Sequence, residues 1–209
     1  MSARSGRLIV LEGIDGSGTT TQAARLATSL REAGQAVVST REPSDGPIGM
    51  VLRQALTRRL VGLSDRMLAL LFAADRLDHL ASVVEPALAE GKVVVSDRYV
   101  LSSLAYQGMR LPLRWVEALN AAARPADLTL YLEVDPRTAA RRRHGRGGAA
   151  ELFDADDVQR SVARAYARVV RKHARAQRVV RVDGRAAPDE VAREILSRVR
   201  AVLSRRAGK

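Results

Sequence analysis

A glycine-rich loop between an apolar run and an amphipathic pattern constrains the fold of this chain more than any other feature. The apolar run covers residues 8–11, and the loop Gly13-Ile14-Asp15-Gly16-Ser17-Gly18-Thr19-Thr20 follows it. After the loop, apolar residues recur at spacings of three and four over residues 23–30, as on one face of a helix. This strand–loop–helix order is the context in which glycines at this spacing form a phosphate-binding P-loop.

The residue types in the loop indicate what it can hold. Its glycines allow consecutive backbone N–H groups to curve around phosphate oxygens, beside the positive end of the following helix. Thr20 occupies the position whose hydroxyl binds Mg²⁺ in such loops. Thr19 occupies the position of the loop's usual lysine, so that cation and its reach toward the outer phosphates are both absent. We expect residues 13–20 to bind the phosphates of ATP; a glycine-rich turn with a capping threonine is the alternative.

Buried strands alternate with helical patterns along the rest of the chain. Short runs rich in Val, Leu and Ile predict strands at residues 7–12, 36–40, 93–97, 128–134 and 178–183. Helix starts are expected at Ser64, Asp135, Asp154 and Pro188, and helix ends just before Gly34 and Gly91. Because no repeat or low-complexity linker divides residues 1–209, we expect one α/β domain with a doubly wound, five-stranded parallel sheet flanked by helices.

Composition excludes some classes of function and leaves others open. Cysteine is absent, so there is no disulfide framework, thiolate metal site or cysteine nucleophile. No apolar run approaches the roughly 20 residues that cross a bilayer, and residues 1–6 lack the apolar core of a signal peptide. We therefore expect a cytoplasmic protein without a membrane partner. The net charge of +12 would suit nucleic acid, but only 3% of residues are aromatic, so we expect no nucleic-acid partner.

Charged residues follow the second and third predicted strands. Residues 40–43 (Thr-Arg-Glu-Pro) and 96–99 (Ser-Asp-Arg-Tyr) stand at their carboxyl ends, which meet the P-loop at one edge of a parallel sheet. Arginines there suit phosphate, and a carboxylate of Asp97 or Glu42 suits a metal ion. Surface ion pairs are the alternative for each cluster.

Two further segments are candidates for the site. Phe72 and Arg76 are four residues apart on a predicted helix, so a ring and a planar donor project from one face, as a nucleobase requires. Packing of Phe72 in the core is the alternative, and residues 102–108 suit either a site or a helix start. Residues 141–148 hold four arginines and three glycines, which predicts a basic, flexible lid at residues 141–153. A disordered surface loop is the alternative there.

Taken in order, these stretches resemble the thymidylate kinases, and the lid resembles that of the bacterial members. The resemblance covers nearly the whole chain and is carried by residues 12–18, 40–43, 71–76, 97–99, 103–108 and 127–132. It implies the P-loop nucleoside monophosphate kinase fold, and a homodimer that moves the γ-phosphoryl of ATP to dTMP with Mg²⁺ as cofactor.

The same resemblance implies roles for individual residues. Phe72 would stack on thymine, Arg76 would bond the carbonyl edge of the base, and Ser103 and Gln107 would lie beside them. Asp15 would bond the sugar 3′-hydroxyl, and Tyr106 would disfavour a 2′-hydroxyl. The residues expected to bind the dTMP phosphate are Arg41 and Arg98, those expected to place Mg²⁺ are Thr20 and Asp97, and those expected to act in catalysis are Asp15, Arg98, Arg142, Arg143 and Arg146.

The chain departs from the family pattern in two places. Thr19 replaces the loop lysine, and the lid reads Glu151-Leu152-Phe153 where the family has an Asp-Arg-aromatic run. Arginines 142, 143 and 146 are the candidates to replace the lost charge. Three alternatives stay open: another nucleotide or nucleoside kinase of this fold, a protein that binds nucleotides without transferring phosphate, and a nucleic-acid-binding protein.

Overall fold

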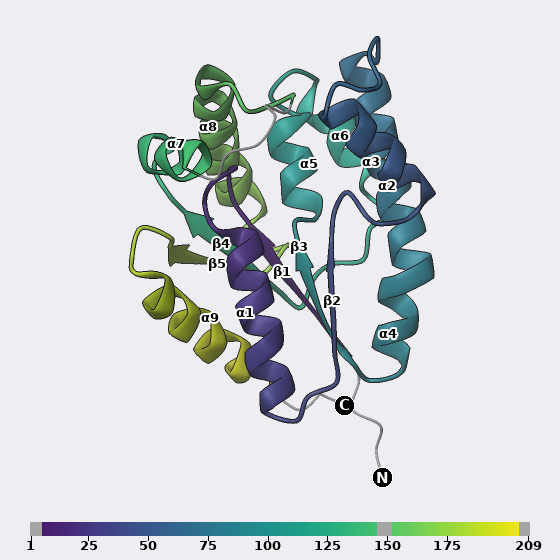
Figure 1. Ribbon diagram of the computed structural model, residues 1–209. Helices are drawn as coiled ribbons and strands as arrows, with labels where there is room; N and C mark the ends of the chain where they lie inside the picture. The colour runs from purple at the N-terminus through teal and green to yellow at the C-terminus, as the bar shows by residue number, and fades with distance from the viewer. Residues whose placement is uncertain (1–5, 146–151, 205–209) are drawn as a thin grey trace.

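A parallel sheet forms the centre of the computed structural model, which describes residues 6–145 and 152–204. The strand order is β2-β3-β1-β4-β5, and each adjacent pair is parallel (Figure 1). The predicted strands agree with the observed ones to within one residue at each end, and the predicted fold class is confirmed. The strands are β1 (Arg7–Glu12), β2 (Val37–Arg41), β3 (Val93–Asp97), β4 (Leu128–Glu133) and β5 (Val179–Asp183).

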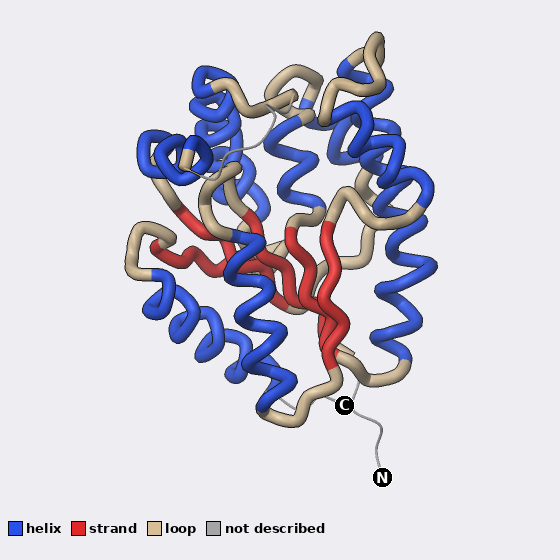
Figure 2. The backbone as a smooth tube through the Cα atoms, viewed as in Figure 1, coloured by secondary structure: helices blue, strands red, loops and turns tan. Residues whose placement is uncertain are grey.

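Helices connect the strands and cover both faces of the sheet (Figure 2). The first half of the chain contains α1 (Thr19–Glu32), α2 (Pro47–Leu56), α3 (Asp65–His79), the π-helical turn η1 (Leu80–Val84) and α4 (Glu85–Ala89). The second half contains α5 (Val100–Tyr106), α6 (Leu113–Leu119), α7 (Pro136–His144), α8 (Asp156–His173) and α9 (Pro188–Leu203).

The central strand β1 is buried on both faces, which explains its unbroken apolar run. Leu8 and Val10 pack with apolar residues of α4, α5 and α8, whereas Ile9 and Leu11 pack with those of α1 and α9. Successive strand residues point to opposite faces, so this alternation divides the core into two layers. Figure 1 shows α1 and α9 together on the nearer face of the sheet.

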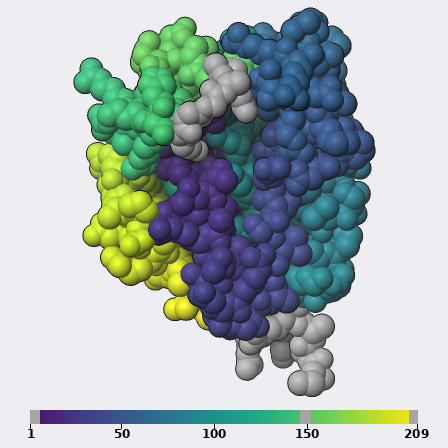
Figure 3. All heavy atoms as spheres, viewed as in Figure 1, coloured from purple at the N-terminus to yellow at the C-terminus, as the bar shows by residue number. Residues whose placement is uncertain are grey.

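The strand register brings the functional segments to one edge. Asp97 is level with Leu11 of β1 and with Arg41 of β2, so the charged ends of β2 and β3 lie beside the P-loop. The chain order reverses at β1, which pairs with both β3 and β4. Ligands of doubly wound sheets bind at such a reversal, outside the carboxyl ends of the strands. Figure 3 shows the purple N-terminal segment between the green α7 and α8 and the blue α2 and α3.

Most predicted helix limits are confirmed by capping contacts. The Ser64 hydroxyl accepts a hydrogen bond from the Met67 N–H, and the Asp135 carboxylate accepts one from the Thr138 N–H. Gly34 and Gly91 follow their helices with φ of 75° and 76°, the left-handed conformation that ends many helices.

Two predicted limits are corrected. Helix α8 starts at Asp156 instead of Asp154, because Ala155 still has extended backbone angles. Arg141, Arg142 and Arg143 were expected in a flexible lid but belong to the last turns of α7, because no helix breaker precedes Gly145. Arg146, the other lid arginine, lies outside the described residues, as does Glu151 of the departing lid run.

Helix α7 makes its closest approach to the P-loop at Gly16. This glycine has φ of +89°, and a Cβ on it would lie 2.3 Å from the carbonyl oxygen of Ala139 in α7. A carbonyl in a helix cannot move aside as the end of a side chain can. Gly16 is therefore needed for its backbone conformation and for space.

We expect Gly16→Ala to lower the free energy of unfolding by about 2–4 kcal/mol, because it adds a backbone clash to the strain of positive φ. Gly34→Ala is the matched control, since Gly34 also has positive φ but a Cβ there meets no atom within 4 Å. The control should lose only about 1 kcal/mol. Urea unfolding measures both losses, and equal values would contradict the close packing of α7 on the loop.

Candidate active site

A pocket of about 140 Å³ opens beside the P-loop, at the carboxyl ends of the strands. Its walls come from the P-loop, the segment after β2, the last residue of α2, helix α3, helix α5 with the turns on either side of it, and the segment before α8. The predicted substrate-binding residues that line it are Asp15, Phe72, Arg76, Arg98, Ser103, Tyr106 and Gln107. Arg41 was predicted to belong with them but does not line this pocket.

Arg76 forms a buried ion pair on one wall. Its Nε and Nη2 donate to the same carboxylate oxygen of Glu42 at 2.9 and 2.7 Å, and both side chains are almost fully buried. Further bonds to the Asn120 side chain and, at 3.1 Å, to the Ser103 hydroxyl hold the plane of the guanidinium. The other Glu42 oxygen lies 3.3 Å from Nδ1 of His79. Glu42 therefore holds Arg76 in place, which leaves Asp97 as the candidate metal ligand of the two carboxylates weighed from sequence.

Arg98 joins the P-loop to the turn before α5. Its guanidinium donates to the Gly13 carbonyl at 2.9 Å and to the Asp15 carboxylate at 2.5 Å, and it lies 5.4 Å from the centre of the Tyr106 ring. Its φ is 76°, a left-handed conformation that costs free energy in any residue except glycine. These contacts hold the cation in the pocket, where it can meet an anionic group of a ligand.

Asp15 is shared between Arg98 and a residue that the sequence did not reveal. Gln159 of α8 donates to the Asp15 carboxylate at 2.5 Å and accepts from the Asp15 N–H at 3.2 Å. Gln159 is fully buried, although its neighbours on the same helix face are apolar residues such as Val162 and Tyr166. A glutamine within the apolar stripe of an amphipathic helix was the available signal.

The Thr20 hydroxyl and the Asp97 carboxylate form the candidate magnesium site. Thr20 Oγ1 donates to Asp97 Oδ2 at 2.5 Å, and Asp97 Oδ1 is buried without a hydrogen-bond partner in the described residues. No cluster of three metal-binding side chains is present in residues 6–145 and 152–204. One carboxylate with one hydroxyl fits Mg²⁺ in a nucleotide site, because this ion keeps several waters and takes other oxygens from phosphates.

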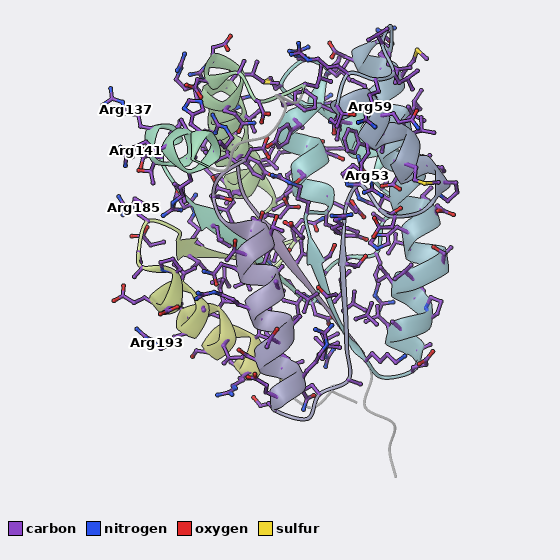
Figure 4. All side chains as sticks on the ribbon, in the orientation of Figure 1. Arg53, Arg59, Arg137, Arg141, Arg185 and Arg193 are labelled. Atoms are coloured by element: carbon purple, nitrogen blue, oxygen red, sulfur yellow. The ribbon has the colours of Figure 1, made fainter. Side chains whose placement is uncertain are left out.

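The arginines of α7 have different surroundings. Arg143 donates to the carbonyl of Asp15 at 2.9 Å and to the Asp156 carboxylate at 2.5 Å, so it lies against the P-loop. Arg142 donates to the Gly184 carbonyl at 2.9 Å, in the loop before α9. Arg141 projects outward from α7, as Figure 4 shows. Among the predicted lid cations that the structure describes, Arg143 is therefore the one in contact with the phosphate loop.

Arg41 belongs to a second, exposed group of charges. Its Nη2 donates to the Asp45 carboxylate at 2.9 Å, and Arg53 of α2 donates to the same oxygen at 2.8 Å. The hydrogen bond from Arg41 lowers the pKa of Asp45. Arg53 was not predicted, because an arginine on a helix carries no signal of the loop that it contacts. Arg41 is the last residue of β2 and Arg53, labelled in Figure 4, belongs to α2; neither lines the pocket.

Aromatic packing shapes the inner end of the pocket. The Tyr106 ring meets Phe153 edge-on at 5.3 Å between centroids and Tyr166 at 6.1 Å. Burial raises the pKa of the Tyr106 phenol far above its usual value, so this group stays neutral. Gln107 Oε1 is buried and has no hydrogen-bond partner in the described residues. The inner end thus combines neutral rings with an amide oxygen that is able to accept a hydrogen bond from a ligand.

Comparison with known proteins identifies the family. The sequence model of the thymidylate kinase family matches residues 11–195, which include every part of the site just described. The chain belongs to the thymidylate kinase family. A thymidylate kinase of Ruegeria pomeroyi is 40% identical over 211 residues, covering 96% of this chain and 98% of that protein. One of Leifsonia xyli subsp. xyli is 40% identical over 203 residues, covering 94% and 95%.

An archaeal relative extends the same comparison. A probable thymidylate kinase of Pyrococcus abyssi is 42% identical over 166 residues, covering 77% of this chain and 81% of its own. This member of the thymidylate kinase family thus has the enzyme class of its relatives: it is a kinase, an enzyme that transfers phosphoryl groups.

Within the described part of the chain, the helices are too short or too polar to span a membrane.

We expect Glu42→Ala to lower the free energy of unfolding by about 3–5 kcal/mol, because it leaves the buried Arg76 charge without its partner. Glu194→Ala is the control, since Glu194 pairs with Arg198 on the exposed surface of α9. It should lose no more than about 1 kcal/mol. Urea unfolding measures both; a loss below about 1 kcal/mol for Glu42→Ala would contradict the structural role of the buried pair.

Proposed function

We propose that this chain transfers the γ-phosphoryl group of ATP to the 5′-phosphate of dTMP, with Mg²⁺, as a step toward dTTP. The observation that carries the proposal is that Asp15 belongs to the phosphate loop and also lines the pocket. Its side chain bonds to Arg98 and Gln159. A donor site on the loop and an acceptor site in the pocket are therefore adjacent, as phosphoryl transfer requires.

The pocket has the chemistry to bind thymine. Phe72 is half-buried and offers a ring face for stacking, while Arg76 offers donors held in a fixed plane. Thymine presents two carbonyl acceptors around one N–H donor. The Arg76 guanidinium and the Ser103 hydroxyl suit the carbonyls, and the Gln107 oxygen suits the N–H. This pattern favours thymine over cytosine, whose exocyclic amine would meet the guanidinium.

The sugar and phosphate would lie between the base and the P-loop. The Asp15 carboxylate would accept from the 3′-hydroxyl, and the neutral Tyr106 ring would crowd a 2′-hydroxyl. Arg98 would bind the 5′-phosphate inside the pocket, and Arg41 would add positive charge from the end of β2. With its phosphate held, an oxygen of dTMP attacks the γ-phosphorus of ATP and the bond to the bridging oxygen breaks, which releases ADP.

The loop residues would hold the donor. Backbone N–H groups of residues 13–20 would bind the ATP phosphates, and Thr20 with Asp97 would hold Mg²⁺. The bound ion would neutralise charge on the phosphates as the γ-group moves. Without a lysine at position 19, we propose that lid arginines supply the remaining charge, and that Arg143 is the main one because it already contacts the loop. Arg142 and Arg146 belong to the same basic segment.

We further propose that the protein is a homodimer. Apolar side chains are exposed on neighbouring helices α2 and α3, among them Met50 (54%), Leu70 (50%) and Leu77 (46%). The two helices pack against each other, so these exposed apolar residues come from adjacent elements of the fold. A second copy of the chain, offering the same apolar surface, would cover them without an unpaired charge.

One alternative function is supported by a specific observation. Thr19 leaves the P-loop without its lysine, so the site could bind ATP and dTMP without transferring phosphate. The two functions differ in product formation and share the same binding site.

The proposed reaction predicts ADP release that depends on dTMP. A coupled assay with ATP and Mg²⁺ should show the highest kcat/KM with dTMP, lower values with dUMP, and none above background with CMP or thymidine. Calorimetry with dTMP runs in parallel. Tight dTMP binding without ADP release would identify the non-catalytic alternative, and preference for another acceptor would identify a different kinase of this fold.

The proposal that Arg143 of α7 replaces the charge of the missing loop lysine predicts the activity of variants at positions 143 and 19. We expect Arg143→Gln to lower kcat by about 10²-fold, with a much smaller effect on dTMP binding, because it removes one cation from the transition state. Thr19→Ala and Thr19→Lys should each change kcat little. Arg141→Gln is the matched control, because Arg141 projects from the outer face of the same helix (Figure 4). A large rise in kcat for Thr19→Lys, with normal activity for Arg143→Gln, would contradict compensation by α7.

A further inference from the structure

A buried carboxylate with no place in the reaction lies directly beneath the site. Glu12 is the last residue of β1, and its side chain is fully buried between β1, α5 and α8. Its Oε1 accepts from the backbone N–H groups of Tyr99 and Ser102 at 2.9 and 3.2 Å. Its Oε2 accepts from the Ser102 hydroxyl at 2.6 Å and the Tyr166 hydroxyl at 2.9 Å. It does not line the pocket.

In its ionised form, Glu12 sets the direction of these hydrogen bonds. An ionised carboxylate can only accept, and each hydroxyl has one hydrogen to give. Ser102 and Tyr166 therefore both donate toward Glu12, and their lone pairs remain for other donors. The two hydroxyl oxygens lie only 2.8 Å apart, so together they form a small region of negative potential.

That region faces Arg98. Nη1 of Arg98 lies 3.3 Å from the Ser102 oxygen and 3.4 Å from the Tyr166 oxygen, and it also donates to the Gly13 carbonyl. An arginine has donors and no acceptor, so it needs the lone pairs that Glu12 leaves free. If the hydroxyls turned, a hydrogen would point at the guanidinium and repel it.

We propose that Glu12 is a positioning residue that fixes Arg98 for the acceptor phosphate through the Ser102 and Tyr166 hydroxyls, without touching any substrate. The role rests on the proposed function, because it takes Arg98 as the group that binds the phosphate of dTMP. Its effect should be largest for ligands with that phosphate, because the base contacts other residues and Asp15, which Arg98 also contacts, keeps its hydrogen bond from Gln159.

The energetics of Glu12 set what its removal does to stability. Burial raises the pKa of Glu12, although the hydrogen bonds from Ser102 and Tyr166 and the charge of Arg98 act in the opposite direction. A carboxyl whose pKa is higher in the folded state lowers stability when it ionises, because the unfolded chain ionises more easily. An amide, however, has one acceptor oxygen in place of two, so Glu12→Gln also loses hydrogen bonds from buried donors. A selective loss of affinity for the phosphate, and not a change in stability, therefore separates a positioning role from a purely structural one.

Calorimetry of Glu12→Gln with separate ligands tests the proposal. We expect dTMP to bind about 10-fold more weakly, the scale of a weakened hydrogen bond to a charged group. Thymidine, which lacks the phosphate, and ATP should bind within about 2-fold of wild type. Urea unfolding of the variant, run in parallel, shows that it is folded under the conditions of the calorimetry. The double variant Ser102→Ala/Tyr166→Phe, which keeps Glu12 but removes the link, should show the same selective loss of dTMP affinity.

Asp127→Asn is the matched control, because Asp127 also accepts from a backbone N–H of β1, at Leu8, but at the opposite end of the strand. It should leave the ratio of dTMP to thymidine affinity unchanged. The proposal is overturned if Glu12→Gln binds dTMP normally, if thymidine affinity falls by the same factor, or if the double variant keeps its dTMP affinity. A wild-type protein that binds no dTMP would instead overturn the proposed function, on which this role depends.

Discussion

The contact of Arg98 with the P-loop is the interaction on which the rest of the site depends. Its guanidinium bonds to Gly13 and Asp15 of the loop, while its backbone stands between β3 and α5. The residue adopts a costly positive φ, and these acceptors hold it there. Because one side chain joins the two segments, the P-loop and the pocket keep a fixed relation. The proposed transfer between two bound phosphates would need that relation within fractions of an ångström.

The pocket owes its shape to charges that are paired before any ligand binds. Arg76 is neutralised by Glu42, and Arg98 by Asp15, each from a different element of the fold. A buried cation without such a partner would cost several kcal/mol and would pull the pocket apart or admit water. With the partners present, the donors are already in place, so a nucleotide meets oriented groups and little reorganisation is needed. Each pair also joins two parts of the wall. Glu42 follows β2 and pairs with Arg76 of α3, whereas Asp15 of the P-loop pairs with Arg98, which follows β3.

The P-loop and α7 depend on each other in this chain. Gly16 lets the helix approach until its backbone touches the loop, and Arg143 reaches the loop carbonyl at Asp15 across that contact. The cation thus stands on the carbonyl side of the loop. A lysine at position 19 would stand within the loop itself. In the proposed reaction, positive charge near the donor would therefore come from a neighbouring helix, and its effect would depend on how closely that helix packs.

Local sequence patterns determined the elements of this protein, and tertiary structure decided most of its contacts. Short unbroken apolar runs specify the strands, and capping residues such as Ser64 and Asp135 together with glycines at positive φ specify helix limits, because these signals act over a few neighbouring residues. The motif residues around the pocket were predicted from the ordered set of motifs shared with a family, because local pattern alone left residues 102–108 open between a site and a helix start. The partners were not: Gln159 lies 144 positions from Asp15, and Tyr166 lies 154 positions from Glu12. Such pairs form only after helices cross the sheet in a particular order, and no short-range pattern records which buried side chains then meet.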